Sequence, residues 1–86
     1  MWKIYYTRKA LKDARKLASS GLKNKAEELL QIISENPYQN PPPYEHLVGD
    51  LSGALSRRIN IQHRLVYQVL EQEKSIKILR LWTHYD

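Results

Sequence analysis

Hydrophobic and polar residues follow two different periods along the chain, and the change of period separates helices from strands. Between residues 10 and 33, apolar residues recur at the spacing of helices that are apolar on one side. Thr7 is the predicted N-cap of a first helix, whose apolar residues recur from Ala10 and which ends at Ser19-Ser20-Gly21. A second helix is predicted over Leu22–Glu35. These two helices form a hairpin whose apolar sides need a partner.

Short runs of aromatic and β-branched residues predict the sheet that covers this hairpin. The predicted strands are Trp2–Tyr6, Ala54–Asn60, His63–Leu70 and Ser75–Trp82. Three consecutive prolines between the second helix and Glu45 predict a stiff, extended connection. The expected fold class is α+β, a four-stranded, largely antiparallel sheet with an N-terminal helical hairpin packed on one face. Residues 1–86 are expected to form a single domain.

Positive charge is concentrated at the beginning of the chain. Residues 1–25 contain eight Lys/Arg and one acidic residue, whereas residues 26–86 contain six basic and eight acidic residues. RNA is a natural partner for such a cationic surface, although a solvated lysine-rich helix face is the plainer explanation. The chain has no cysteine, and no apolar run approaches the roughly 18 residues that span a bilayer. We expect a soluble cytoplasmic protein without membrane contact.

Three arginines, Arg57, Arg58 and Arg64, lie within the predicted strands. Because side chains alternate along a strand, Arg58 and Arg64 can share a face only if the two strands pair them. Guanidinium groups held on a sheet face bind phosphate well. The predicted RNA contacts are Arg57 and Arg58 in the sheet and Lys9, Lys12 and Lys16 on the first helix.

The residues suited to chemistry indicate metal-free RNA cleavage. The three histidines lack the spacing of a metal site, so we predict neither metal nor cofactor, and His63 is interpreted as structural. Metal-free cleavage needs a base for the ribose 2′-hydroxyl, cations around the phosphorane and an acid for the leaving oxygen. Glu45, Arg58 with Arg64, and His84 can meet these needs in that order, and Tyr85 can stack on a base.

Three sequence runs resemble the YoeB/Txe toxins of bacterial type II toxin–antitoxin systems, within the RelE-like superfamily. They are Leu51-Ser52-Gly53, Ser56-Arg57-Arg58-Ile59 and His63-Arg64-Leu65-Val66-Tyr67. The proline-rich approach to Glu45 and the terminal His84-Tyr85 extend the resemblance over nearly the whole chain. It implies a ribosome-dependent mRNA endonuclease that cuts in the A site, leaving a 2′,3′-cyclic phosphate and a free 5′-hydroxyl.

The resemblance also implies a role for each matching residue. Glu45 falls on the general base, Arg64 on the phosphate-stabilising arginine and Arg58 on a second basic contact. His84 falls on the general acid, and Tyr85 on the tyrosine that holds the mRNA.

The sequence departs from the family pattern in two places. Val48-Gly49 stands where some members have Lys-His, so that a phosphate contact is either missing or supplied by His46. Asp86 follows the tyrosine at which many members end.

The family pattern further implies partners. These are a cognate antitoxin of the Phd/YefM type, mRNA and the 70S ribosome, and operator DNA only through the antitoxin complex. A toxin homodimer is expected by analogy. Two other functions stay open. One is a non-catalytic toxin on the same fold, like the ParE proteins that inhibit gyrase. The other is a basic RNA- or ribosome-binding module, in which Glu45→Ala leaves activity intact.

Overall fold

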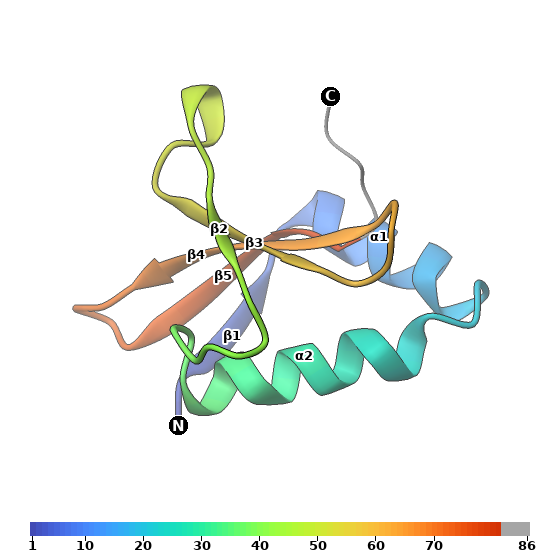
Figure 1. Ribbon diagram of the computed structural model, residues 1–86, viewed down its shortest axis with the longest axis horizontal. Coiled ribbons are helices and arrows are strands. Elements are labelled where there is room, and N and C mark those ends of the chain that lie inside the picture. Colours follow the sequence, from blue (N-terminus) through green and yellow to red (C-terminus); the bar gives the residue numbers. More distant parts are fainter. Residues whose placement is uncertain (82–86) are drawn as a thin grey trace.

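The computed structural model describes residues 1–81, which form two α-helices and one five-stranded sheet (Figure 1). The sheet order is β1-β5-β4-β3-β2, with β1 parallel to β5 and every other pair antiparallel. The α+β class is confirmed, but the predicted four strands are five, because the two residues of β2 pair with β3. In chain order the elements are β1 (Lys3–Tyr6), α1 (Arg8–Ala18), α2 (Lys23–Glu35), β2 (Glu45–His46), a 3₁₀ turn (Gly49–Leu51), β3 (Ala54–Arg58), β4 (Arg64–Leu70) and β5 (Ser75–Arg80).

Both helices lie close to their predicted bounds. The side-chain oxygen of Thr7 accepts a hydrogen bond from the amide of Ala10 at 3.1 Å, as expected of an N-cap, and α1 therefore begins at Arg8. Gly21 has a φ of +84°, which glycine adopts without steric cost, so the predicted glycine turn between the helices is confirmed. Neither helix is long and apolar enough to cross a membrane.

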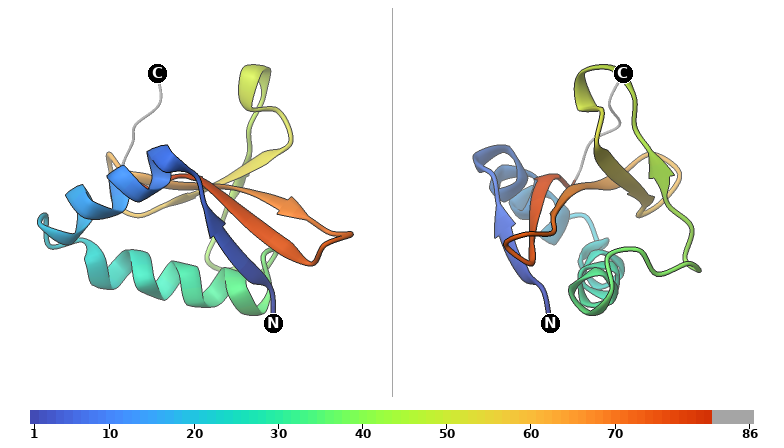
Figure 2. Two further views of the ribbon diagram at one scale, coloured as in Figure 1. Left: turned by 180° about the vertical axis from the view of Figure 1, so that it is seen from behind. Right: turned by 90° about the vertical axis from the view of Figure 1, so that its left-hand side faces the viewer.

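The hydrophobic core lies between the two helices and one face of the sheet. The strand residues in it occupy alternating positions that the register places on the same face. Both helices therefore cover this face, as predicted, and Figure 2 shows them against the sheet in two further views. The main buried members are Ala10, Leu17, Ala26, Leu29 and Ile33 from the helices, and Leu55, Leu65, Tyr67, Ile76 and Ile78 from the strands.

Asp13 fastens α1 to the end of β5. Its carboxylate is buried and accepts hydrogen bonds from Arg80 Nε at 2.7 Å and from the Leu81 amide at 3.1 Å. The hydrogen bond from Arg80 to this carboxylate raises the pKa of Arg80 above its ordinary value. A buried charge is tolerated when it is paired and hydrogen-bonded, and this pair sets the end of the described chain against α1.

The sheet face opposite the helices, called the open face below, carries several polar strand residues. Residues directly opposite each other in an antiparallel pair project from the same face. The register pairs Glu45 with Ser56 and Arg58 with Arg64. Arg58 and Arg64 therefore share the open face. The two strands pair these residues, which was the condition for a shared face.

Candidate active site

The segment of residues 37–44 leads from the end of α2 to β2, which carries Glu45 (Figure 1). It starts with a local turn in which the Asn36 side chain accepts a hydrogen bond from the Tyr38 amide at 3.0 Å. The backbone then bends at Pro41 and Pro42, so the predicted extended conformation is wrong at these two residues. The stiffness of this segment therefore depends on what it contacts.

Arg57 is buried beneath this segment, with an exposed fraction of 1%. Its guanidinium donates hydrogen bonds from Nε to the Tyr67 hydroxyl at 2.9 Å and from Nη1 to the Pro42 carbonyl at 2.6 Å. From Nη2 it donates to the carbonyls of Pro37 at 3.1 Å and Gln39 at 2.8 Å. The prediction that Arg57 contacts RNA is therefore wrong, because its guanidinium is buried and occupied by acceptors of the protein itself.

Strand alternation explains this correction and could have revealed it in the sequence. Arg57 shares its strand face with Leu55, a buried core residue, whereas its neighbour Arg58 projects from the open face. Two adjacent arginines in a strand cannot both face a ligand on one side. The apolar residues at positions 55 and 59 were the signal that Arg57 points toward the core.

Tyr67 gives this network a testable pH dependence. Burial raises the pKa of Tyr67 above its ordinary value of 10.0, and the hydrogen bond from Arg57 opposes the rise only in part. The folded state thus favours the neutral phenol, whose stabilising contribution is complete below pH 10.0 and is lost as the pH rises through the higher folded-state pKa. In urea denaturation series we expect the free energy of unfolding to fall more steeply above about pH 10 in wild type than in Tyr67→Phe.

Other tyrosines do not obscure this comparison. Burial also raises the pKa values of Tyr6 and Tyr38, but both tyrosines are present in the two proteins that are compared. Identical alkaline slopes for wild type and Tyr67→Phe would contradict the expectation.

Glu45, Arg58 and Arg64 line one cavity on the open face, with a volume of about 330 Å³. This volume lies at the lower end of the range of small-ligand sites. The Glu45 carboxylate oxygen lies 3.7 Å from Arg64 Nη1. At this distance the two groups attract each other but do not form a hydrogen bond. The carboxylate therefore keeps its capacity to accept a proton from another donor.

The charge of the cavity suits a phosphate group. Two guanidinium groups face one carboxylate, and guanidinium stays charged and binds phosphate oxygens in a bidentate manner. The Arg64 side chain is 21% exposed and that of Glu45 is 69% exposed. The arginine is thus held by its surroundings, while the carboxylate is open to a ligand. A base beside fixed cations is the arrangement that proton transfer next to a phosphate requires.

Three lining residues, Pro43, Tyr44 and Ser56, were not predicted as site residues. Tyr44 precedes Glu45, and its ring lies 4.9 Å from the Arg57 guanidinium carbon. Ser56 is the register partner of Glu45. In the sequence, only its position next to Glu45 indicated that Tyr44 lines the site. No local feature of the sequence indicated this for Ser56.

The remaining predicted site residues do not join the cavity. Lys9, Lys12 and Lys16 are exposed on α1, which packs against the other face of the sheet. His84 and Tyr85, predicted as general acid and mRNA contact, lie outside the described residues, as does Trp82 at the predicted end of the last strand.

The two histidines within the described chain take no part in the cavity. His46 follows Glu45, projects from the other side of β2 and packs its ring 5.8 Å from the Tyr44 ring. His46 therefore does not line the cavity, where it would have to lie to replace the phosphate contact that some family members make through Lys-His. The His63 side chain is buried, in agreement with a structural role. Residues 1–81 contain no group of three or more His, Cys, Asp or Glu that could hold a metal ion.

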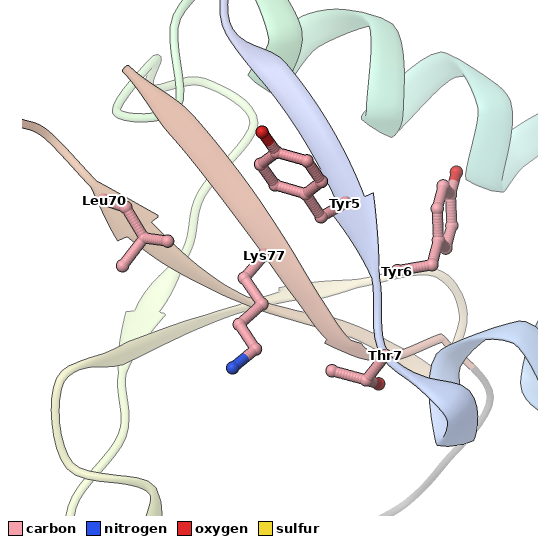
Figure 3. Close-up of a pocket in the computed structure, with 5 residues that line it drawn as sticks. All are labelled: Tyr5, Tyr6, Thr7, Leu70 and Lys77. Carbon is pink, nitrogen blue, oxygen red and sulfur yellow. The ribbon is translucent and has the colours of Figure 1, made fainter. Parts of the chain in front are cut away.

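A second hollow of about 270 Å³ lies on β1, β4 and β5, at a distance along the sheet from Glu45 (Figure 3). Tyr5, Tyr6, Thr7, Leu70 and Lys77 line it, and Figure 3 shows the Tyr6 ring turned to the opposite side of β1 from Tyr5. Its lining offers one cation, Lys77, and no carboxylate, so it lacks the combination of a carboxylate with two arginines that lines the cavity around Glu45. The cavity around Glu45 is therefore the candidate active site.

Comparison with known proteins identifies the family. Residues 6–85 match the sequence profile described as the YoeB-like toxin of bacterial type II toxin-antitoxin systems. A Toxin YoeB from Synechocystis is 39% identical over 58 residues, 67% of this chain and 65% of that protein, so the match spans slightly under two thirds of the relative's length.

Solved structures agree with this match over nearly the full chain. A YoeB/ParE toxin from Agrobacterium tumefaciens has 26% identity and a TM-score of 0.87, with 96% of this chain and 99% of that chain covered. The toxin in a YoeB-YefM complex from Staphylococcus aureus has 33% identity and a TM-score of 0.82, with 99% of each chain covered. The same organism's YoeB dimer has 32% identity and a TM-score of 0.80, with 98% of each covered. The chain thus belongs to the family of YoeB-like toxins of bacterial type II toxin–antitoxin systems.

Proposed function

We propose that this protein is a ribosome-dependent endoribonuclease that cleaves mRNA in the A site and inhibits translation. The observation that carries the proposal is the Glu45 carboxylate 3.7 Å from the Arg64 guanidinium, in a cavity that Arg58 also lines. A base beside cations is what the first step of metal-free phosphodiester cleavage needs. Membership of the family supports the same reaction.

The proposed reaction assigns one task to each group. Glu45 accepts the proton of the ribose 2′-hydroxyl, and the 2′ oxygen forms a bond to the adjacent phosphorus. Arg64 and Arg58 stabilise the negative charge that develops on the phosphorane oxygens. The bond from phosphorus to the 5′ oxygen breaks as His84, the acid implied by the family resemblance, donates its proton to that oxygen. The products are a 2′,3′-cyclic phosphate and a free 5′-hydroxyl, while Tyr85 holds the mRNA.

Exposure of the carboxylate gives a physical reason for the dependence on ribosomes. The Glu45 side chain is 69% exposed in the free protein, so water screens its interactions with substrate and with the arginines. Enclosure in the A site would exclude this water and strengthen each electrostatic interaction. The basic face of α1, with Lys9, Lys12 and Lys16, would contact rRNA, and binding should therefore weaken as the salt concentration rises.

The family also points to protein partners. A cognate antitoxin of the Phd/YefM type would bind this toxin, in parallel with the S. aureus YoeB-YefM complex. It would cover or distort the cavity and thereby neutralise the toxin. The toxin would reach operator DNA only through this complex, and a toxin homodimer would parallel the S. aureus YoeB dimer. Because the proposed partners include ribosomes and mRNA, the bacterial cytoplasm is the location that we propose.

Primer extension on a defined mRNA with purified 70S ribosomes tests the proposal. We expect wild-type protein to cut at the A-site codon only when ribosomes are present. His84→Ala should cut at least about 100-fold more slowly, because it lacks the acid for the leaving oxygen. His46→Ala, which changes a histidine outside the cavity, should cut like wild type. Ribosome binding without cleavage by the wild type would favour the RNA-binding module instead.

A further inference from the structure

The proposed reaction requires Glu45 to be held in place, yet the Glu45 side chain contributes little to its own position. It is 69% exposed, and its contact with Arg64 is an ion pair at 3.7 Å. Such exposed pairs hold a side chain only weakly. The position of the carboxylate therefore depends on the backbone that carries it.

That backbone has little regular structure of its own. Strand β2 pairs through only two residues, Glu45 with Ser56 and His46 with Leu55, and one further bond runs from the Leu47 amide to Ala54. Within residues 37–44 of the described chain, the hydrogen bonds that do not involve Arg57 or Tyr67 are local. They join Tyr38 and Gln39 to Asn36, and the Gln39 side chain to Pro41.

Arg57 and Tyr67 supply hydrogen bonds that connect this segment to the sheet, in addition to the packing of Pro37 and Tyr44 against the core. Arg57 donates to the carbonyls of Pro37, Gln39 and Pro42, and the Tyr67 hydroxyl donates to the Pro37 carbonyl at 2.7 Å. The Arg57 guanidinium also lies under the Tyr44 ring, at a cation–π distance of 4.9 Å. These contacts extend from the first residue of the segment to the residue that immediately precedes Glu45.

We propose that Arg57, supported by Tyr67, is a positioning residue that fixes the backbone of residues 37–44 and thereby holds Glu45 opposite Arg64. The role rests on the proposed function, because it concerns the geometry of the same reaction. The guanidinium projects from the helix-covered face of β3, while its neighbours Ser56 and Arg58 line the cavity on the open face. A single short strand thus carries the cavity residues and the residue that orders the segment leading to Glu45.

The test combines two variants with one matched control. Arg57→Lys keeps the positive charge but loses the fork that reaches three carbonyls, and Tyr67→Phe removes one hydroxyl from the same network. Ile76→Ala is the control, because Ile76 is buried in the core on β5. Its truncation destabilises the fold, while its aliphatic side chain takes no part in the hydrogen bonds to residues 37–44. All proteins are compared at a temperature at which circular dichroism shows them to be folded.

Two readouts separate positioning from general stability. One is the single-turnover rate of mRNA cleavage, with the ribosome concentration that gives half the maximal rate. The other is amide hydrogen exchange of residues 37–46, which does not depend on activity. We expect Arg57→Lys to cleave about 10- to 100-fold more slowly at an unchanged half-saturating concentration, with faster exchange in residues 37–46. Tyr67→Phe should show the same changes to a smaller extent, and Ile76→Ala neither.

The contrary outcomes are distinct. Equal slowing in Ile76→Ala would assign the effect to global stability, and faster exchange with a wild-type cleavage rate would show that order in the segment is not needed. Either result overturns the positioning role. If wild-type protein does not cleave at all, the proposed function fails and the positioning role fails with it. If amide exchange of residues 37–46 were still faster in Arg57→Lys, Arg57 would order this segment without any role in catalysis.

Discussion

Glu45→Gln is expected to slow ribosome-dependent mRNA cleavage by about 10²- to 10⁴-fold, the usual contribution of a positioned general base. The amide has nearly the shape of the carboxylate but cannot accept the proton of the 2′-hydroxyl. Since the side chain is 69% exposed and pairs with Arg64 only at 3.7 Å, the free energy of unfolding should change by less than about 0.5 kcal/mol. Single-turnover rates at saturating ribosomes measure the effect.

The affinity for ribosomes should move in the opposite direction or not at all. Removing a negative charge beside Arg58 and Arg64 leaves the cavity more positive toward phosphate, so the half-saturating ribosome concentration should stay equal or fall. Glu71→Gln is a suitable control, because Glu71 is exposed in the turn between β4 and β5. A wild-type rate for Glu45→Gln would exclude the general-base role and favour a protein that only binds.

Arg57→Met is expected to lower the free energy of unfolding by about 3–5 kcal/mol, a large part of the stability of a small domain. Methionine fills much of the space but donates no hydrogen bond, so the carbonyls of Gln39 and Pro42 lose their donor and the Pro37 carbonyl keeps only the Tyr67 hydroxyl. Each unsatisfied buried acceptor costs roughly 1–3 kcal/mol, and the lower values apply where an acceptor is only part-buried. The midpoint and slope of urea denaturation measure this change.

The adjacent residue provides the control for this prediction. Arg58→Met changes the same residue type in the same strand, but Arg58 is exposed, and its effect should stay within about 0.5 kcal/mol. Methionine at position 57 also removes the cost of burying a charge, which acts in the stabilising direction. A loss below about 1 kcal/mol would mean that the carbonyls reach water when the guanidinium is absent.

Local sequence signals predicted the elements whose cause is local. Thr7 and Gly21 marked the limits of α1 and the turn to α2, because an N-cap hydrogen bond and a positive φ depend on single residues. Strand β3 ended two residues before its predicted end at Asn60. There the Asn60 side chain accepts hydrogen bonds from the amides of Gln62 and His63. The chain therefore turns at residues where the sequence predicted that the strand continues.

The candidate site was predicted in its residue types better than in its arrangement. Glu45, Arg58 and Arg64 were chosen from the sequence, and the structure places all three in one cavity. Arg57 was chosen for the same reason as Arg58, but its side chain is buried and donates hydrogen bonds to Tyr67 and to the Pro42 carbonyl. Strand alternation shows that the two arginines project from opposite faces. Only the packed fold shows which acceptors bind the guanidinium of Arg57.

By itself the sequence determined the two helices and their turn, the three longer strands that follow them, the family and the identity of the acid–base candidates. These features depend on residue type and on spacing within a few positions. Only the tertiary structure decided the existence of β2, the burial of Arg57 and the closeness of Glu45 to Arg64. A strand of two residues has no period of its own and forms because β3 offers it partners. The distance between Glu45 and Arg64 is set by the register of three strands, which long-range hydrogen bonds and side-chain packing select together.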